Sequence, residues 1–169
     1  MDVQNILVPI DYSGDSQGAL QWGGSLAEKY GAKLLLLHVI PKSVEEVFRE
    51  GGVFVSSTSS FHEVRAPDTQ SFRRHPIIID LVDTAHTELQ DFADKNLKDT
   101  VAVQVKVAVG RPAEEILCVA REEKVDLIVM GTHGHTGLRH LLLGSVAEAV
   151  TRHAPCPVFT VRFGFEAAP

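Results

Sequence analysis

Short, continuously apolar runs alternate along this chain with segments whose apolar residues recur at helical spacing. Continuous apolar runs are typical of strands buried on both faces, and helical spacing predicts amphipathic helices that cover such strands. The predicted strands are Asn5–Ile10, Lys33–Ile40, Val101–Val109, Asp126–Met130 and Val158–Phe163. The predicted helices cover residues 16–30, residues 76–96, a segment that begins at Pro112, and residues 145–153.

This alternation predicts the fold class, because strands that alternate with helices are joined by crossovers that leave them parallel. We therefore expect a doubly wound α/β fold of Rossmann-like type, with a five-stranded, mostly parallel sheet and helices on both faces. No repeat or domain boundary interrupts the pattern, so residues 1–169 are predicted to form a single domain. The ligand site of such a sheet lies beyond the carboxyl ends of the strands, where the strand order reverses.

Residues 42–75 break the pattern and are predicted to form an irregular insertion. They contain the pair Gly51-Gly52 and a run of serine and threonine, and no apolar period survives for more than a few residues. A connection of this length without regular structure is uncommon in a compact domain. Three interpretations stay open: a lid over a ligand, a surface for a partner, or a disordered loop.

Composition excludes several classes of function. The net charge of −6 gives no basic surplus, so we expect no nucleic-acid partner. The longest nearly unbroken apolar run, Leu34–Ile40, is too short to span a bilayer, so we expect no membrane partner. The two cysteines, Cys118 and Cys156, make neither a disulfide framework nor a zinc site, and the expected location is the cytoplasm. We expect Cys118 to pack at the core or its boundary, beside Ile116 and Leu117.

A glycine-rich loop carries the strongest functional signal. It runs from Gly131 through Gly134 to Gly144, directly after the most strand-like run, and a predicted helix opens at Ser145. Glycines let backbone N–H groups converge on an anion, and the start of a helix adds unpaired N–H donors and partial positive charge. Ser145 can cap this helix or donate its hydroxyl to a phosphate. The alternative is a long turn whose glycines only satisfy backbone geometry. The loop matches neither the Walker A nor the dinucleotide fingerprint.

The spacing Gly131-x2-Gly134-x9-Gly144-Ser145 resembles the nucleotide-binding signature of the universal stress protein family. Three further pieces are similar to that family: Pro9 and Asp11 before Ser13, His38-Val39 after a leucine run, and Pro155-x-Pro157-Val158 before the last strand. The resemblance covers residues 4–41 and 76–163. It implies a fold like that of the adenine nucleotide alpha hydrolases, and the retained glycines indicate the ATP-binding branch.

The resemblance also implies a function and a set of site residues. It indicates a stress-response module that binds ATP, ADP or AMP, with or without Mg²⁺, and acts through a homodimer or another protein partner. The homodimer would form through the last strand, Val158–Phe163. Asp11 would contact the ribose or adenine beside Pro9, and Val39 would offer backbone groups to the adenine edge. Met130 and Gly131 would pass under the ribose and phosphates; the phosphate chain would be surrounded by His133, Gly134, Gly144, Ser145 and Val146.

Other roles for these residues stay open. Arg139 either reaches a γ-phosphate or is a plain surface arginine. His133, His135 and His140 could hold a metal ion; the alternative is that His133 contacts phosphate while His135 and His140 lie on a solvated loop. Asp11 could cap a helix or act as a general base, but spacing fixes no partner acid or nucleophile, so no catalytic residue is assigned. A slow ATPase and a nucleotide-independent interaction module are the two alternative functions.

Overall fold

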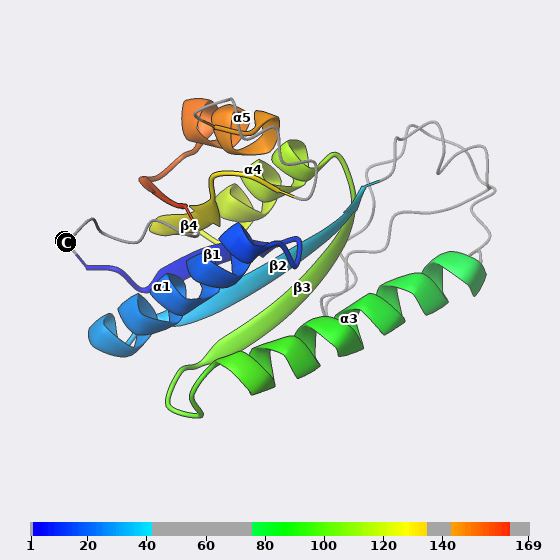
Figure 1. Ribbon diagram of the computed structural model, residues 1–169, viewed down its shortest axis with the longest axis horizontal. Helices are drawn as coiled ribbons and strands as arrows, with labels where there is room; N and C mark the ends of the chain where they lie inside the picture. The colour runs from blue at the N-terminus through cyan, green and yellow to red at the C-terminus, as the bar shows by residue number, and fades with distance from the viewer. Residues whose placement is uncertain (1, 42–75, 135–142, 163–169) are drawn as a thin grey trace.

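The computed structural model describes residues 2–41, 76–134 and 143–162, without the side chains of residues 76–81 (Figure 1). The predicted insertion at 42–75 lies outside this part of the chain, so its role stays a prediction, as does the single domain. The elements, in chain order, are β1 (Asn5–Ile10), α1 (Gly14–Tyr30), β2 (Lys33–Pro41), α3 (Pro76–Asn96), β3 (Val103–Gly110), α4 (Pro112–Glu122), β4 (Leu127–Gly131), α5 (Ser145–His153) and β5 (Val158–Val161).

The five strands form one sheet in the order β3-β2-β1-β4-β5, and every neighbouring pair is parallel. The chain builds outward from β1 through β2 to β3, and then returns to the other side of β1 for β4 and β5. The strand order therefore reverses between β1 and β4, which confirms the predicted doubly wound fold. A ligand site is expected at the carboxyl ends of these two strands.

Helices cover both faces of the sheet (Figure 1). Ile6 and Val8 of β1 face a core that includes residues of α1 and α3. Leu7, between them, faces a second core that includes residues of α4 and α5. Successive side chains of a strand point to opposite faces, so a strand covered on both faces is apolar throughout. This is why β1 and β2 appear in the sequence as unbroken apolar runs.

Helix α1 begins and ends at residues suited to those positions. Its N-cap is Ser13, whose Oγ accepts the N–H of Ser16 at 3.3 Å. Its C-cap, Gly31, has φ +64°, a left-handed conformation that glycine adopts without strain. These two caps fix where the chain leaves β1 and where it enters β2, which places the first turn of α1 beside the carboxyl end of β1.

Cys118 departs from its predicted position. It is exposed on α4, where its Sγ donates a hydrogen bond to Glu122 Oε1 at 3.4 Å. It follows the buried Ile116 by two residues, about 200° round the helix, and so faces away from the core. Partial desolvation and then the bond to Glu122 raise the pKa of the Cys118 thiol. No helix within the described residues is long and apolar enough to cross a membrane.

Candidate functional site

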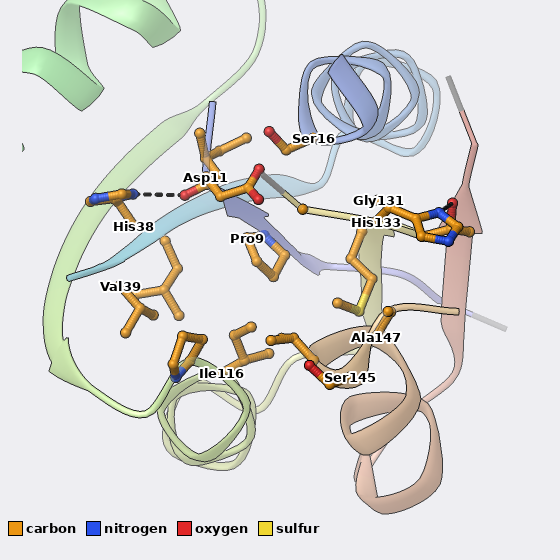
Figure 2. A pocket seen from close by; sticks show the side chains of 18 of the residues that line it. Pro9, Asp11, Ser16, His38, Val39, Ile116, Gly131, His133, Ser145 and Ala147 are labelled. Atoms are coloured by element: carbon orange, nitrogen blue, oxygen red, sulfur yellow. Dashed lines mark hydrogen bonds between the residues drawn. The ribbon is translucent and has the colours of Figure 1, made fainter. Parts of the chain in front are cut away.

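A cavity of about 350 Å³ opens at the carboxyl ends of β1, β2 and β4, where the fold places a ligand site (Figure 2). This volume lies within the range of small-molecule sites. Arg139, His135 and His140 lie outside the described residues. The other residues predicted for the site all line the cavity: Pro9, Asp11, Val39, Met130, Gly131, His133, Gly134, Gly144, Ser145 and Val146.

One end of the cavity is apolar because β2 is longer than β1. The β1–β2 pairing ends at Ile10 and His38, whereas β2 continues beside β3 as far as Pro41. The last residues of β2 therefore have no strand partner on the β1 side, and the cavity lies against this overhang. Its apolar lining there is supplied by Val39, Pro41, Pro112 and Ile116. His38 also lines the cavity, and its Nδ1–H donates to the Ile10 carbonyl at 2.8 Å.

Asp11 lies in a sharp turn directly after β1. Its Oδ1 accepts the N–H of Ser13 at 3.0 Å and the hydroxyl of Ser13 at 2.5 Å. Tyr12, between them, has φ +63°, a conformation that non-glycine residues rarely adopt and that is concentrated at functional sites. Asp11 Oδ2 lies close to Gly134, because a Cβ added at Gly134 would be 2.6 Å from it. The turn thus holds the carboxylate at the cavity wall, next to the loop.

The first turn of α5 forms the opposite wall. Gly144 is the N-cap, and its N–H donates to the Thr132 carbonyl at 2.8 Å. The first bond of the helix runs from the Glu148 N–H to the Gly144 carbonyl at 2.9 Å. The three residues between, Ser145 to Ala147, line the cavity, and their N–H groups bond to no other described residue. Such N–H groups at a helix start attract anions.

One sequence prediction changes at this wall. Ser145 is not the cap of α5, because the N-cap is Gly144 and no side chain caps the helix. The hydroxyl of Ser145, which lines the cavity, keeps its second predicted role as a donor to a ligand. His133 also lines the cavity, and its Nδ1 lies 3.0 Å from Thr132 Oγ1. The ring is thus engaged by the protein.

Thr132 lines the cavity and Asp15 bonds to it from behind, and the sequence indicated neither role. Asp15 Oδ2 accepts the Thr132 hydroxyl at 2.8 Å and the His133 N–H at 3.0 Å. The first turn of α1 packs directly on Gly131, where an added Cβ would be 2.7 Å from Asp15 Cβ. An acid in the first turn of a helix is common for dipole reasons alone, so nothing in the sequence indicated that Asp15 bonds to the residues that follow β4.

The described residues that line the cavity contribute no fixed cation. Among the described residues that line it, none is lysine or arginine, and Asp11 is the one carboxylate. Within the described ranges, no three His, Cys, Asp or Glu side chains gather closely enough to hold a metal ion. Among the described residues, the groups available to an anion are therefore backbone N–H groups and hydroxyls.

Comparison with known proteins identifies the family. The model of the universal stress protein family matches residues 2–162. The chain belongs to the universal stress protein family. It is 32% identical over 157 residues to universal stress protein YxiE of Bacillus subtilis, covering 93% of this chain and 97% of that one. The resemblance seen in the sequence motifs is thereby confirmed.

Solved structures of other members have the same fold. The structure of MJ0577 of Methanocaldococcus jannaschii has a TM-score of 0.66 at 29% identity and covers 96% of this chain and 97% of that one. A universal stress protein in complex with cAMP has a TM-score of 0.59 at 22% identity and covers 96% and 98%. The second likeness shows the fold alone.

Proposed function

We propose that this universal stress protein binds ATP or another adenine nucleotide in the cavity between β1 and β4. The observation that carries the proposal is the pairing of two unlike walls. An apolar end at the β2 overhang suits a base, and the N–H groups of Ser145 to Ala147 suit phosphates. The complex of another family member with cAMP is consistent with an adenine nucleotide as the ligand.

Most of the predicted residues have a place in this arrangement. The adenine would lie at the overhang, where the main chain of Val39 can bond to its edge. Asp11 would accept hydrogen bonds from the ribose hydroxyls, since an ionised carboxylate only accepts. Met130 and Gly131 would lie beneath the ribose. Because Gly134 and Gly144 have no Cβ, the phosphate chain could approach the backbone closely there. Arg139 would reach the γ-phosphate at the far end of that chain.

We propose binding rather than catalysis as the activity. Asp11 already accepts two hydrogen bonds from Ser13, and no second acid among the described lining residues faces it as a proton-transfer partner. Its carboxylate suits a Mg²⁺ ion held mainly by phosphate oxygens and water. Such an ion would neutralise phosphate charge, because the described lining residues include no lysine or arginine that could do so.

We further propose that the bound state acts through contacts between subunits, with the sheet edge at β5 as the interface of a homodimer. β5 is an edge strand, and edge strands are normally covered or blocked. Phe159 of β5 is 40% exposed and packs edge-on against Trp22 of α1, which is 53% exposed, with ring centroids 5.6 Å apart. Exposed aromatic pairs of this kind are typical of interfaces.

We also propose that the protein lies in the cytoplasm, and the two free cysteines are consistent with that location.

Calorimetric titration with ATP tests the proposal, with a matched pair of variants. A Cβ added at Gly134 would be 2.6 Å from Asp11 Oδ2, and one added at Gly110 would be 2.6 Å from Glu115 Oε1. Gly110 does not line the cavity. We expect Gly134→Ala to weaken ATP binding about tenfold, because it displaces the ribose-binding carboxylate, and Gly110→Ala to leave it unchanged.

Three results would overturn parts of this proposal. Absence of ATP binding at concentrations that detect a Kd of about 100 μM would overturn nucleotide binding and favour the interaction module. Equal affinity in the two glycine variants would place the nucleotide elsewhere. Phosphate release by the purified protein that is abolished by Asp11→Asn would establish the slow ATPase instead.

A further inference from the structure

Asp15 lies outside the cavity wall, yet its carboxylate holds the end of β4. Oδ2 accepts hydrogen bonds from the Thr132 hydroxyl at 2.8 Å and from the His133 N–H at 3.0 Å. The side chains of Asp15 and His133 are 15% and 10% exposed, with His133 Nδ1 3.6 Å from the same oxygen. A carboxylate that only complemented the dipole of α1 would need none of these partners.

Thr132 connects Asp15 to the first turn of α5. It is 7% exposed, and its hydroxyl, N–H and carbonyl are all bonded. The N–H donates to the Val161 carbonyl of β5 at 2.9 Å, and the carbonyl accepts the Gly144 N–H at 2.8 Å. Because the single hydroxyl proton goes to Asp15, the Thr132 oxygen accepts the Nδ1–H of His133. Buried networks in which every member is bonded are rigid.

The chain of bonds ends at the residues proposed to hold phosphate. Gly144 is the N-cap of α5, and the three residues that follow it line the cavity. The position of Gly144 therefore sets where the N–H groups of those residues point. Asp15 reaches them through Thr132, whereas the apolar base end at Val39 lies on the far side of the cavity (Figure 2).

We propose that Asp15 is a positioning residue of the nucleotide site: through Thr132 it fixes the first turn of α5 and so sets affinity for the phosphates, not the nucleoside. This inference rests on the proposed function. The direction in which ATP affinity changes when Asp15 is removed tests this role. A carboxylate near the phosphates should weaken ATP binding by repulsion if it had no other role. Removing it should then tighten binding, whereas loss of positioning weakens it.

Titration of ATP and of adenosine into the same variants tests the role. We expect Asp15→Ala and Thr132→Val to weaken ATP binding about tenfold while adenosine affinity stays within about twofold. Thr132→Ser keeps the hydroxyl and should retain ATP affinity. The double variant Asp15→Ala/Thr132→Val should be no weaker than either single one, because both remove one connected unit.

Amide hydrogen exchange provides a readout that needs no ligand. In Asp15→Ala and Thr132→Val the Gly144 N–H should exchange faster than in the native protein, with amides of β1 unchanged. Tighter ATP binding in Asp15→Ala, equal losses for ATP and adenosine, or an unchanged Gly144 exchange rate would each overturn the positioning role. A native protein that binds neither ATP nor adenosine would overturn the proposed function itself. The exchange rate of the Gly144 N–H needs no ligand, so it separates failure of the proposed function from failure of the positioning role.

Discussion

Replacing Gly131 with alanine should destabilise the fold, because the first turn of α1 rests on this residue. The added Cβ would lie 2.7 Å from Asp15 Cβ, 2.9 Å from the Asp15 carbonyl carbon and 3.0 Å from Ser16 N. Two of these atoms belong to the backbone, so no side-chain rotation relieves the contact. To reach ordinary contact at 3.4 Å, the start of α1 must withdraw by about 0.7 Å.

Insertion of one methyl group into a packed contact of this kind costs about 1–3 kcal/mol. For a chain of this length, each kcal/mol lowers Tm by about 2–4 °C, so Gly131→Ala should lower Tm by about 2–12 °C. Thermal unfolding measures the shift, and urea unfolding at constant m confirms that native-state stability changed.

Gly110→Ala is the matched control. Its Cβ would approach Glu115 Oε1 even more closely, at 2.6 Å, but that atom ends a flexible side chain which can turn away. We expect a Tm loss clearly smaller than that of Gly131→Ala. Equal losses in the two variants, or none in Gly131→Ala, would refute the argument that backbone contact at Gly131 fixes α1 against β4.

Three further predictions concern stability and assembly. Tyr12→Phe should leave the free energy of unfolding unchanged or raise it by about 1 kcal/mol, because the Tyr12 hydroxyl is buried and has no hydrogen-bond partner among the described residues; a clear loss in urea unfolding would contradict this. Burial, followed by Glu114 and Glu122, raises the pKa of Glu115, so its ionised form disfavours folding. Glu115→Gln should therefore raise Tm at pH 8, with the gain lost as pH falls below about 4.5; an equal gain at both pH values would contradict it. Phe159→Lys should convert a dimer to monomer in sedimentation velocity, and an unchanged dimer would move the interface away from β5.

The sequence predicted the regular elements well because their signals are local. Helix α5 was predicted at its observed bounds, Ser145 to His153, since a glycine, a serine and an apolar period mark it. The parallel, doubly wound sheet followed from the alternation of elements, and the structure places the reversal of strand order between β1 and β4. Given these elements and this strand order, the predicted site residues lie together at the carboxyl ends of the strands.

The features that were missed depend on contacts between distant parts of the chain. Asp15 and Thr132 are 117 positions apart, and nothing near either one predicts their bond. The cap of α5 is a glycine whose N–H is held by Thr132, so Ser145 became the first helical residue instead of the cap. Cys118 was misplaced because its neighbours are apolar, although its angular position on α4 turns it outward.

A crystal structure of the nucleotide-free protein soaked with ATP tests the central claim most directly. We predict phosphate oxygens at hydrogen-bond distance from the N–H groups of Ser145, Val146 and Ala147, with the adenine against Val39 and the ribose at Asp11. A nucleotide bound elsewhere, or phosphates held by side-chain cations while those N–H groups bond only to water, would contradict it.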